Sequence, residues 1–359
     1  MEESTEKLEV LRARMTEVNE LIMHNLNTFF QISNKIGELK DKMGISHFDP
    51  VRESEMLSEI REKNRGPMPY DLMKRIFKDI FRASVEEMGV ESRKRLKVNR
   101  LPDGKDLVIL VNGIEIGGER PVLISGPCAV EDFEQLHTTA VKIKELGINI
   151  LRGGAFKPRT SPYSFQGLEE EGLKMLRTVA DGLDMAVISE VLDTRTVPLV
   201  AEYVDIIQVG TRNMFNYSLL KELGKTKKPV MIKRGLMATI DELILAAEYV
   251  FTGGNHQIIL CERGVRTFES QTRNTLDISS IPILHKETPL PVIVDLSHSL
   301  GRKDIVKPIA RASLSAGANG LMFESHNDPA VALSDAQQQL DLDEAEGLVT
   351  YLRRFFEFS

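Results

Sequence analysis

The residues of this chain that could do chemistry lie at the ends of short apolar segments spread over its C-terminal two thirds. Each of eight runs rich in Val, Ile and Leu ends in, or is followed by, charged, thiol or imidazole side chains. One Lys or Arg after such a run is usually a solvated loop charge, but here a chain of net charge −7 places cations repeatedly at this point. Converging cations predict a substrate with several negative charges, such as phosphates and carboxylates. The side chains concerned are Cys128, Arg152, Lys157, Arg159, Glu190, Arg212, Lys233, Arg263, Arg266, His298, Glu324 and Asp335.

Four of these side chains could bind a divalent transition metal ion. They follow the first, seventh and eighth runs, which become neighbours if the runs are strands of a closed barrel. They lack the close spacing of a zinc-finger motif, and each alone has a structural explanation, such as a buried thiol. One thiolate, one imidazole and two carboxylates suit Mn²⁺, Fe²⁺ or Zn²⁺, whereas we interpret His326 as a structural neighbour. The candidate ligands are Cys128, His298, Glu324 and Asp335.

The elements that must position these residues are parallel strands alternating with amphipathic helices. Continuous Val/Ile/Leu runs are typical of parallel strands covered on both faces, and eight such units over about 240 residues predict a (β/α)₈ barrel. A doubly wound open sheet is the alternative, and the count of eight favours the barrel. In such a barrel the active site is built from the C-terminal strand ends. Ahead of it, Asn112-Gly113 predicts a tight hairpin turn. The runs span 122–128, 148–154, 186–191, 205–210, 229–235, 257–264, 291–298 and 320–326.

The N-terminal part of the chain has a different pattern. From Leu8 to Ile36, apolar residues recur at three- and four-residue steps, which predicts one long amphipathic helix. Asp49-Pro50 predicts the start of a second helix, and a third is expected at about 70–88. Such a long helix needs a partner for its apolar stripe, so we expect a bundle completed by a second copy of the chain. The predicted domains are residues 1–90 (all-helical), 91–104 (linker) and 105–359 (barrel).

Composition narrows the possible partners and compartments. No apolar stretch reaches the ~18 residues of a membrane-spanning helix, and the acidic, polar N-terminus fits neither a secretory signal nor a transit peptide. The negative charge argues against general binding to nucleic acid or anionic membranes. Two cysteines, Cys128 and Cys261, suit a reducing cytoplasm.

The stretch RGGAFKPRTSPYSFQG (152–167) is the most distinctive in the chain, because its cations, hydroxyl side chains and rigid turn suit a phosphorylated ligand. Together with GPCAVE, GTRNM, KRG, LCERGVRT and DLSHSLGRKD, it resembles 3-deoxy-D-arabino-heptulosonate 7-phosphate (DAHP) synthase. More narrowly, it is similar to the short barrel type that occurs fused to chorismate mutase. The resemblance covers about 105–345, and KPRTS separates it from the related octulosonate 8-phosphate synthases, the remoter alternative.

This resemblance implies a metal-dependent condensation of phosphoenolpyruvate with erythrose 4-phosphate, the first step of the shikimate pathway to aromatic amino acids. It implies the same four metal ligands and a homotetramer. A catalytically dead phosphate-binding module is the competing interpretation, and the presence of every candidate ligand favours the enzyme. Lys157 is the expected acid–base residue. By resemblance, Arg152, Lys157, Arg212, Lys233 and Arg263 would bind phosphoenolpyruvate, and Arg159, Thr160 and Ser161 would bind erythrose 4-phosphate.

The N-terminal segment resembles the all-helical chorismate mutase domain with two departures. Phe29 stands where that family has an Arg that binds a substrate carboxylate, and Met88 stands where it has a polar contact to the ether oxygen. Losing one preorganised donor typically costs ~10²–10³ in rate. We therefore expect a regulatory or weakly active domain that responds to prephenate or chorismate, with a fully bifunctional enzyme as the alternative. The family's remaining site positions correspond to Arg12, Lys40, Asp49, Arg52 and Glu53.

Overall fold

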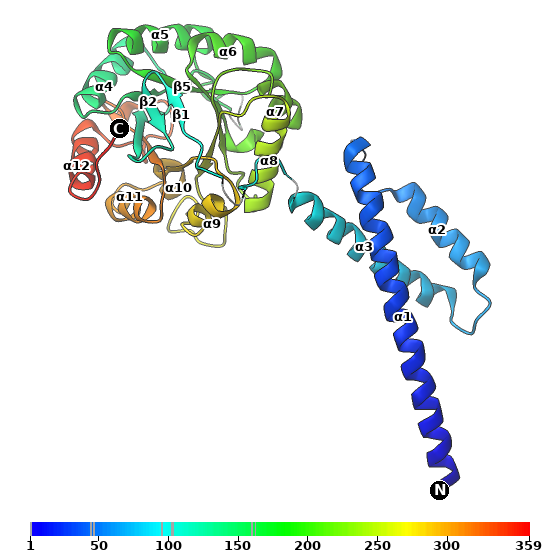
Figure 1. Ribbon diagram of the computed structural model, residues 1–359. Helices are drawn as coiled ribbons and strands as arrows, with labels where there is room; N and C mark the ends of the chain where they lie inside the picture. The colour runs from blue at the N-terminus through cyan, green and yellow to red at the C-terminus, as the bar shows by residue number, and fades with distance from the viewer. Residues whose placement is uncertain are drawn as a thin grey trace. The chain divides into compact units, whose positions relative to one another are not determined.

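The computed structural model describes residues 2–43, 45, 47–94, 96–101, 104–158, 161 and 163–359. The chain divides into two compact units, Met1–Leu96 and Lys97–Ser359. The first is all-helical and the second alternates strands with helices (Figure 1). Among the described helices, none combines the length and hydropathy that a membrane crossing requires.

The first unit contains three helices, as the sequence predicted. The second of them begins where expected, because the Asp49 side chain accepts a hydrogen bond from the Arg52 N–H at 3.0 Å and Pro50 occupies the first turn. The third helix continues past the predicted end at Met88. The helices are α1 (Glu2–Met43), α2 (Pro50–Lys63) and α3 (Tyr70–Lys94).

The two halves of α1 have different surroundings. In the C-terminal half, Phe29 stacks on Phe81 of α3 with ring centroids 6.1 Å apart. Gly37 lets α3 approach closely, since a Cβ atom there would lie 3.0 Å from the Met88 side chain. The N-terminal half runs past α2 and α3 (Figure 1), and its apolar residues face solvent in the single chain. We call this set the α1 stripe: Leu8, Val10, Leu11, Met15, Val18, Leu21, Ile22 and Met23.

The second unit is a closed barrel of eight parallel strands, which confirms the predicted (β/α)₈ fold (Figure 1). Every residue of the eight strands is buried apart from Glu190 in β5, and burial on both faces explains why the runs read as continuous Val, Ile and Leu. The strands are β3 (Val122–Gly126), β4 (Ile150–Arg152), β5 (Ala186–Val191), β6 (Ile206–Val209), β7 (Val230–Lys233), β8 (Ile258–Glu262), β9 (Val292–Asp295) and β10 (Gly320–Glu324).

Helices follow the strands and surround the barrel (Figure 1). Several begin with the side-chain caps expected of stable helix starts; Thr239 and Glu242, for example, form a capping box. The helices are α4 (Phe133–Glu145), α5 (Glu169–Gly182), α6 (Val197–Tyr203), α7 (Tyr217–Leu223), α8 (Ile240–Thr252), α9 (Ser280–Glu287), α10 (Leu296–Leu300), α11 (Val306–Ser315) and α12 (Leu342–Leu352).

The predicted hairpin is present ahead of the barrel, as β1 (Ile109–Val111) and β2 (Ile114–Ile116). Its turn residues, Asn112 and Gly113, both have positive φ, 47° and 80°. The inward side chains of the hairpin are buried in one cluster with residues at the N-terminal ends of the barrel strands. The hairpin therefore closes the end of the barrel away from the polar strand ends.

Barrel closure brings the first and last strands together. β10 pairs with β3 in parallel, so Glu324 lies opposite Gly126, two residues before Cys128. β10 also pairs with β9, whose last residue, Asp295, precedes the helix that carries His298. The strand order thus places Cys128 beside His298, Glu324 and Asp335, although 170 to 207 residues separate it from them along the chain.

Candidate active site

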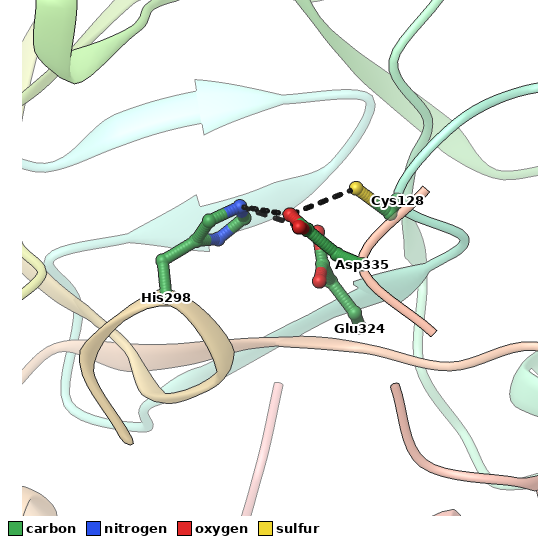
Figure 2. A group of neighbouring side chains, drawn as sticks. All are labelled: Cys128, His298, Glu324 and Asp335. Carbon is green, nitrogen blue, oxygen red and sulfur yellow. Dashed lines mark hydrogen bonds and ion pairs between the residues drawn. The ribbon is translucent and has the colours of Figure 1, made fainter. Parts of the chain in front are cut away.

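The four candidate metal ligands converge at the C-terminal end of the barrel. Their ligand atoms all lie within 4.8 Å of one another, and Figure 2 shows the thiol, the imidazole and both carboxylates facing one another. Cys128 and Glu324 are fully buried, while His298 and Asp335 are partly open to the cavity. Four donors of these types at this separation fit one divalent transition ion.

The imidazole of His298 is oriented by a carboxylate on its own turn. Asp295 caps α10 by accepting from the His298 N–H at 3.0 Å, and its Oδ2 lies 2.9 Å from His298 Nδ1. Burial alone would raise the pKa of Asp295, but His298 and Lys233 outweigh it and hold the pKa well below its usual range. An ionised Asp295 fixes the proton on Nδ1. Nε2 is then free to bind a metal, 3.4 Å from Glu324 Oε1.

Protein cations lie against the other ligands. Arg152 Nη1 is 2.6 Å from Glu324 Oε1, and Lys157 Nζ is 3.0 Å from Cys128 Sγ. Burial raises the pKa of the Cys128 thiol to about 11 in the metal-free protein. For Glu324, burial is outweighed by His298 and Arg152, so its pKa lies well below the usual value. Because the raised pKa keeps the Cys128 thiol protonated, binding a metal at this sulfur would release a proton.

The predicted phosphoenolpyruvate-binding cations line one cavity of about 390 Å³, beside the metal ligands. Lys233 is buried and its Nζ lies 2.5 Å from Asp295 Oδ2, so one carboxylate contacts both this cation and His298. The lining also includes Ser161, whereas Arg159 and Thr160 fall outside the described residues. The cations in the wall are Arg152, Lys157, Arg212, Lys233, Arg263, Arg266 and Arg273.

Arg263 has the least compensated charge of these cations. Its side chain is 4% exposed, and within the described part of the chain it forms no ion pair. Nη1 donates to the Gly264 carbonyl at 3.3 Å and Nε has no partner. Burial lowers the pKa of Arg263, and the Asp295 carboxylate offsets only part of this effect. Nε of Arg152 is likewise buried without a partner. Each of these two buried guanidiniums thus keeps one N–H group without an acceptor, which favours an anionic ligand in the cavity.

Several polar residues of the site were not predicted. Asp295 had a possible sequence signal, because an Asp three residues before a candidate His is an N-cap position. Gln338 and Gln339 had none: Gln338 donates to Glu324 and Asp335, and Gln339 accepts from the Cys128 N–H at 2.9 Å.

The residues predicted for the helical site form local contacts, which are exposed except for that of the half-buried Lys40. Arg12 pairs with Glu9 one turn away, Arg52 pairs with Glu55, and Lys40 donates to the His47 carbonyl. Asp49 serves as the α2 cap, and Glu53 lies in the first turn of that helix.

Instead, the helical unit has an apolar cavity of about 490 Å³. We call it the helical cavity; it is formed where α1, α2 and α3 face one another. Phe29 is part of its wall, while Met88 is buried against Gly37. Aromatic and sulfur side chains therefore occupy the two positions at which the resemblance to chorismate mutase predicts polar contacts. The lining residues are Phe29, Met56, Glu59, Ile60, Lys63, Asn64, Arg65, Met73, Phe77 and Phe81.

Comparisons with known proteins agree with the two-unit organisation. The DAHP synthetase I family model matches residues 95–356, and the chorismate mutase type II model matches residues 11–88. A phospho-2-dehydro-3-deoxyheptonate aldolase of Thermotoga maritima is 52% identical over 250 residues, which cover 70% of this chain and 74% of that protein. A 2-dehydro-3-deoxyphosphooctonate aldolase of Geobacter sulfurreducens is 32% identical, over 68% of this chain and 96% of its own length.

Solved structures give the same picture. The crystal structure of the Thermotoga maritima DAHP synthase matches with a TM-score of 0.70 and 51% identity, over 72% of this chain and 76% of that one. A truncated form of that synthase matches with a TM-score of 0.67 and 47% identity, over 72% of this chain and 94% of the truncated one.

Proposed function

Because this chain belongs to the DAHP synthetase I family and is a DAHP synthase with a chorismate mutase type II domain, we propose that its barrel condenses phosphoenolpyruvate with erythrose 4-phosphate in a metal-dependent reaction. The observation that carries this proposal is the polar cavity in which two buried guanidiniums, those of Arg152 and Arg263, each with an Nε that has no partner, lie beside four metal-ligand side chains. The same enzyme would supply the first step of the shikimate pathway, in the cytoplasm, where the free thiols Cys128 and Cys261 stay reduced.

The chain's own residues have distinct tasks in this reaction. Arg152, Lys233 and Arg263 would bind the phosphate and carboxylate of phosphoenolpyruvate, and Ser161 would contact the second phosphorylated substrate together with the predicted Arg159 and Thr160. A divalent ion such as Mn²⁺ or Fe²⁺, held by the four ligands, would polarise the aldehyde oxygen.

We assign proton transfer in the same step to Lys157. The enol carbon of phosphoenolpyruvate bonds to the aldehyde carbon, water adds at the carbon that carries the phosphate, and inorganic phosphate leaves. The aldehyde oxygen must gain a proton as it becomes a hydroxyl. Lys157 Nζ, buried and 3.0 Å from Cys128 Sγ, lies close enough to the ligand set to provide it.

The octulosonate-type reaction is the competing function. A seven-carbon heptonate requires a four-carbon aldose phosphate in addition to the three carbons of phosphoenolpyruvate, whereas an eight-carbon octonate requires a five-carbon one. The higher identity to the heptonate enzyme, 52% against 32%, favours the four-carbon substrate. Phosphate release from phosphoenolpyruvate, measured with each aldose phosphate and with Mn²⁺ present, separates the two. Faster release with the five-carbon aldose would overturn the assignment.

For the helical unit we propose pairing with a second copy and a regulatory task. The α1 stripe is apolar and exposed, and the apolar helical cavity lies on the same unit, so two copies related by a two-fold axis could each cover the other's apolar surface. Two such dimers would form the expected homotetramer. Cations at Arg12, Lys40 and Arg52 leave some affinity for a dicarboxylate, which supports prephenate or chorismate as effector.

Phe29 and Met88 stand where the resemblance predicts polar contacts to the substrate. Their apolar side chains make efficient mutase turnover the weaker alternative to regulation. A direct assay of chorismate consumption by the full chain tests this point. Turnover at the level of ordinary chorismate mutases would establish the fully bifunctional enzyme instead.

A further inference from the structure

Gln338 is a buried amide in contact with two of the four candidate metal ligands. It lies in the segment between β10 and α12 and is 5% exposed. Nε2 donates to Glu324 Oε2 at 2.6 Å and to Asp335 Oδ2 at 3.3 Å. Oε1 accepts from Arg273 Nη1 at 2.5 Å. One uncharged side chain therefore links two ligand carboxylates to a cation.

Arg273 determines which end of the amide faces the carboxylates. A guanidinium only donates hydrogen bonds, so the amide oxygen of Gln338 must face Arg273 and the NH₂ group must face the ligands. The flipped amide would place its oxygen against two carboxylate oxygens. Arg273 comes from the β8–α9 loop, where its N–H donates to the Leu300 carbonyl at 2.9 Å. The orientation of Gln338 is thus fixed from outside its own loop.

We propose that Gln338 is a positioning residue of the metal site, which holds Glu324 and Asp335 in the arrangement that binds the ion. This inference rests on the divalent metal site proposed above. Glu324 directs Oε1 toward His298 Nε2, and Gln338 occupies Oε2 on the other side of the same carboxylate. Asp335 itself has a φ of 51° and lies outside any helix or strand, and its Oδ2 is also 3.2 Å from Arg273 Nη1, the atom that donates to Gln338.

The role proposed for Gln338 requires a side chain without charge. A lysine at 338 would compete with the ion for Glu324 and Asp335, and a glutamate would add a third carboxylate that repels both. An amide donates two hydrogen bonds without changing the charge of the site. Partners of this kind, which orient metal ligands, typically change metal affinity by about 10–100-fold when they are removed.

The test compares Gln338→Met with Gln337→Met in the full chain. Methionine has nearly the length of glutamine and cannot donate hydrogen bonds to Glu324 or Asp335. Gln337 is exposed and next in the same loop, and no hydrogen bond ties it to a ligand, so it is the matched control. After metal removal, Mn²⁺ is added and the free ion is measured by electron paramagnetic resonance. Gln338→Met should bind Mn²⁺ about 10–100-fold more weakly, whereas Gln337→Met should match the unmodified chain.

Kinetics distinguish positioning from general damage. Gln338 is not in the wall of the substrate cavity, so saturating Mn²⁺ should restore kcat in Gln338→Met while KM for phosphoenolpyruvate stays unchanged. Equal Mn²⁺ affinity in Gln338→Met and the unmodified chain would overturn the inference and leave the metal site intact. Failure of the unmodified chain to bind Mn²⁺ would instead overturn the metal site itself.

If Gln338→Met does not fold by circular dichroism, Gln338→Asn takes its place. The shorter amide keeps its donors but withdraws them from both carboxylates, so weaker Mn²⁺ binding is again expected. Unchanged affinity in that variant would contradict the proposal equally.

Discussion

The barrel cavity and the helical cavity differ in what holds their charged groups. In the barrel, Arg152, Lys233 and Asp295 are almost fully buried and contact residues from other strands. In the wall of the helical cavity, Lys63 pairs with Glu59 one turn away on the same helix, at 3.1 Å and in solvent. Exposed pairs of this kind contribute little to stability and do not fix a geometry. The comparison indicates that one cavity is preorganised within a single chain and that the other is not.

The largest expected effect is the loss of DAHP synthase activity when metal is removed, because only the barrel cavity is expected to need a metal ion. Treatment with a chelator should reduce DAHP synthase activity to background, and added Mn²⁺ should restore it, since polarisation of the aldehyde contributes several kcal/mol. Phosphate release is the measurement. Full activity in a preparation shown by elemental analysis to lack metal would contradict the assignment of all four ligands.

The next effect concerns the charge that the barrel leaves uncompensated. Arg263→Gln should lower kcat/KM for phosphoenolpyruvate by about 10²–10³. Removal of this guanidinium should leave thermal stability nearly unchanged, because Arg263 has no ion pair to lose in the described part of the chain. Arg195→Gln, which breaks an exposed pair with Asp193, is the control and should have normal kinetics. Equal loss in both variants would show that Arg263 does not bind substrate.

Replacing each of the two cysteines with serine should change a different property of the protein. Cys128→Ser should weaken Mn²⁺ binding by about 10–100-fold, by analogy with other changes that disturb a metal site. Cys261 lies in the apolar barrel core, so Cys261→Ser should cost about 1–3 kcal/mol of unfolding free energy and leave Mn²⁺ affinity unchanged. Mn²⁺ titration and chemical denaturation of both variants measure the contrast. Equal Mn²⁺ affinity in the two would remove Cys128 from the ligand set.

The two cavities also differ in how much of their structure could be predicted from the sequence. The barrel and the convergence of Cys128, His298 and Glu324 were predictable, because the carboxyl ends of parallel strands meet at one end of a barrel. The hydrogen bonds of Gln338 were not, because they depend on loop backbone such as the left-handed conformation at Asp335, whereas those of Asp295 had only an N-cap position as a signal. In the helical unit, periodicity predicted the helices, but it could not show what surrounds Phe29.

Substitutions at Phe29 and Met88 test whether these two apolar side chains alone limit chorismate mutase activity. Phe29→Arg with Met88→Gln should raise chorismate mutase turnover by at least about tenfold, since one preorganised donor is typically worth more than that. The new guanidinium would lie beside Phe81 in a largely apolar wall, so some loss of thermal stability is expected. Ile32→Arg, at an exposed position of α1, is the control. No gain in a folded double variant would show that the defect is not confined to these two positions.

The smallest expected effect on catalysis comes from removing the helical unit. A chain that begins at Lys97 keeps the bond from the Val98 N–H to Glu248 on α8, and Arg100 keeps its contacts to the His285 and Thr288 carbonyls. The barrel should therefore remain closed, and its activity without effector should change by no more than a few-fold.

Prephenate and chorismate should alter the activity of the full chain and have no effect on the shortened one, because a ligand shifts an equilibrium only through the unit to which it binds. Phosphate release across an effector titration measures both properties, and size-exclusion chromatography reports the accompanying loss of self-association. If the shortened chain still responds, the effector binds the barrel; if the full chain does not respond, the helical unit serves assembly alone. In either case the difference between the two cavities would remain, but it would no longer explain regulation.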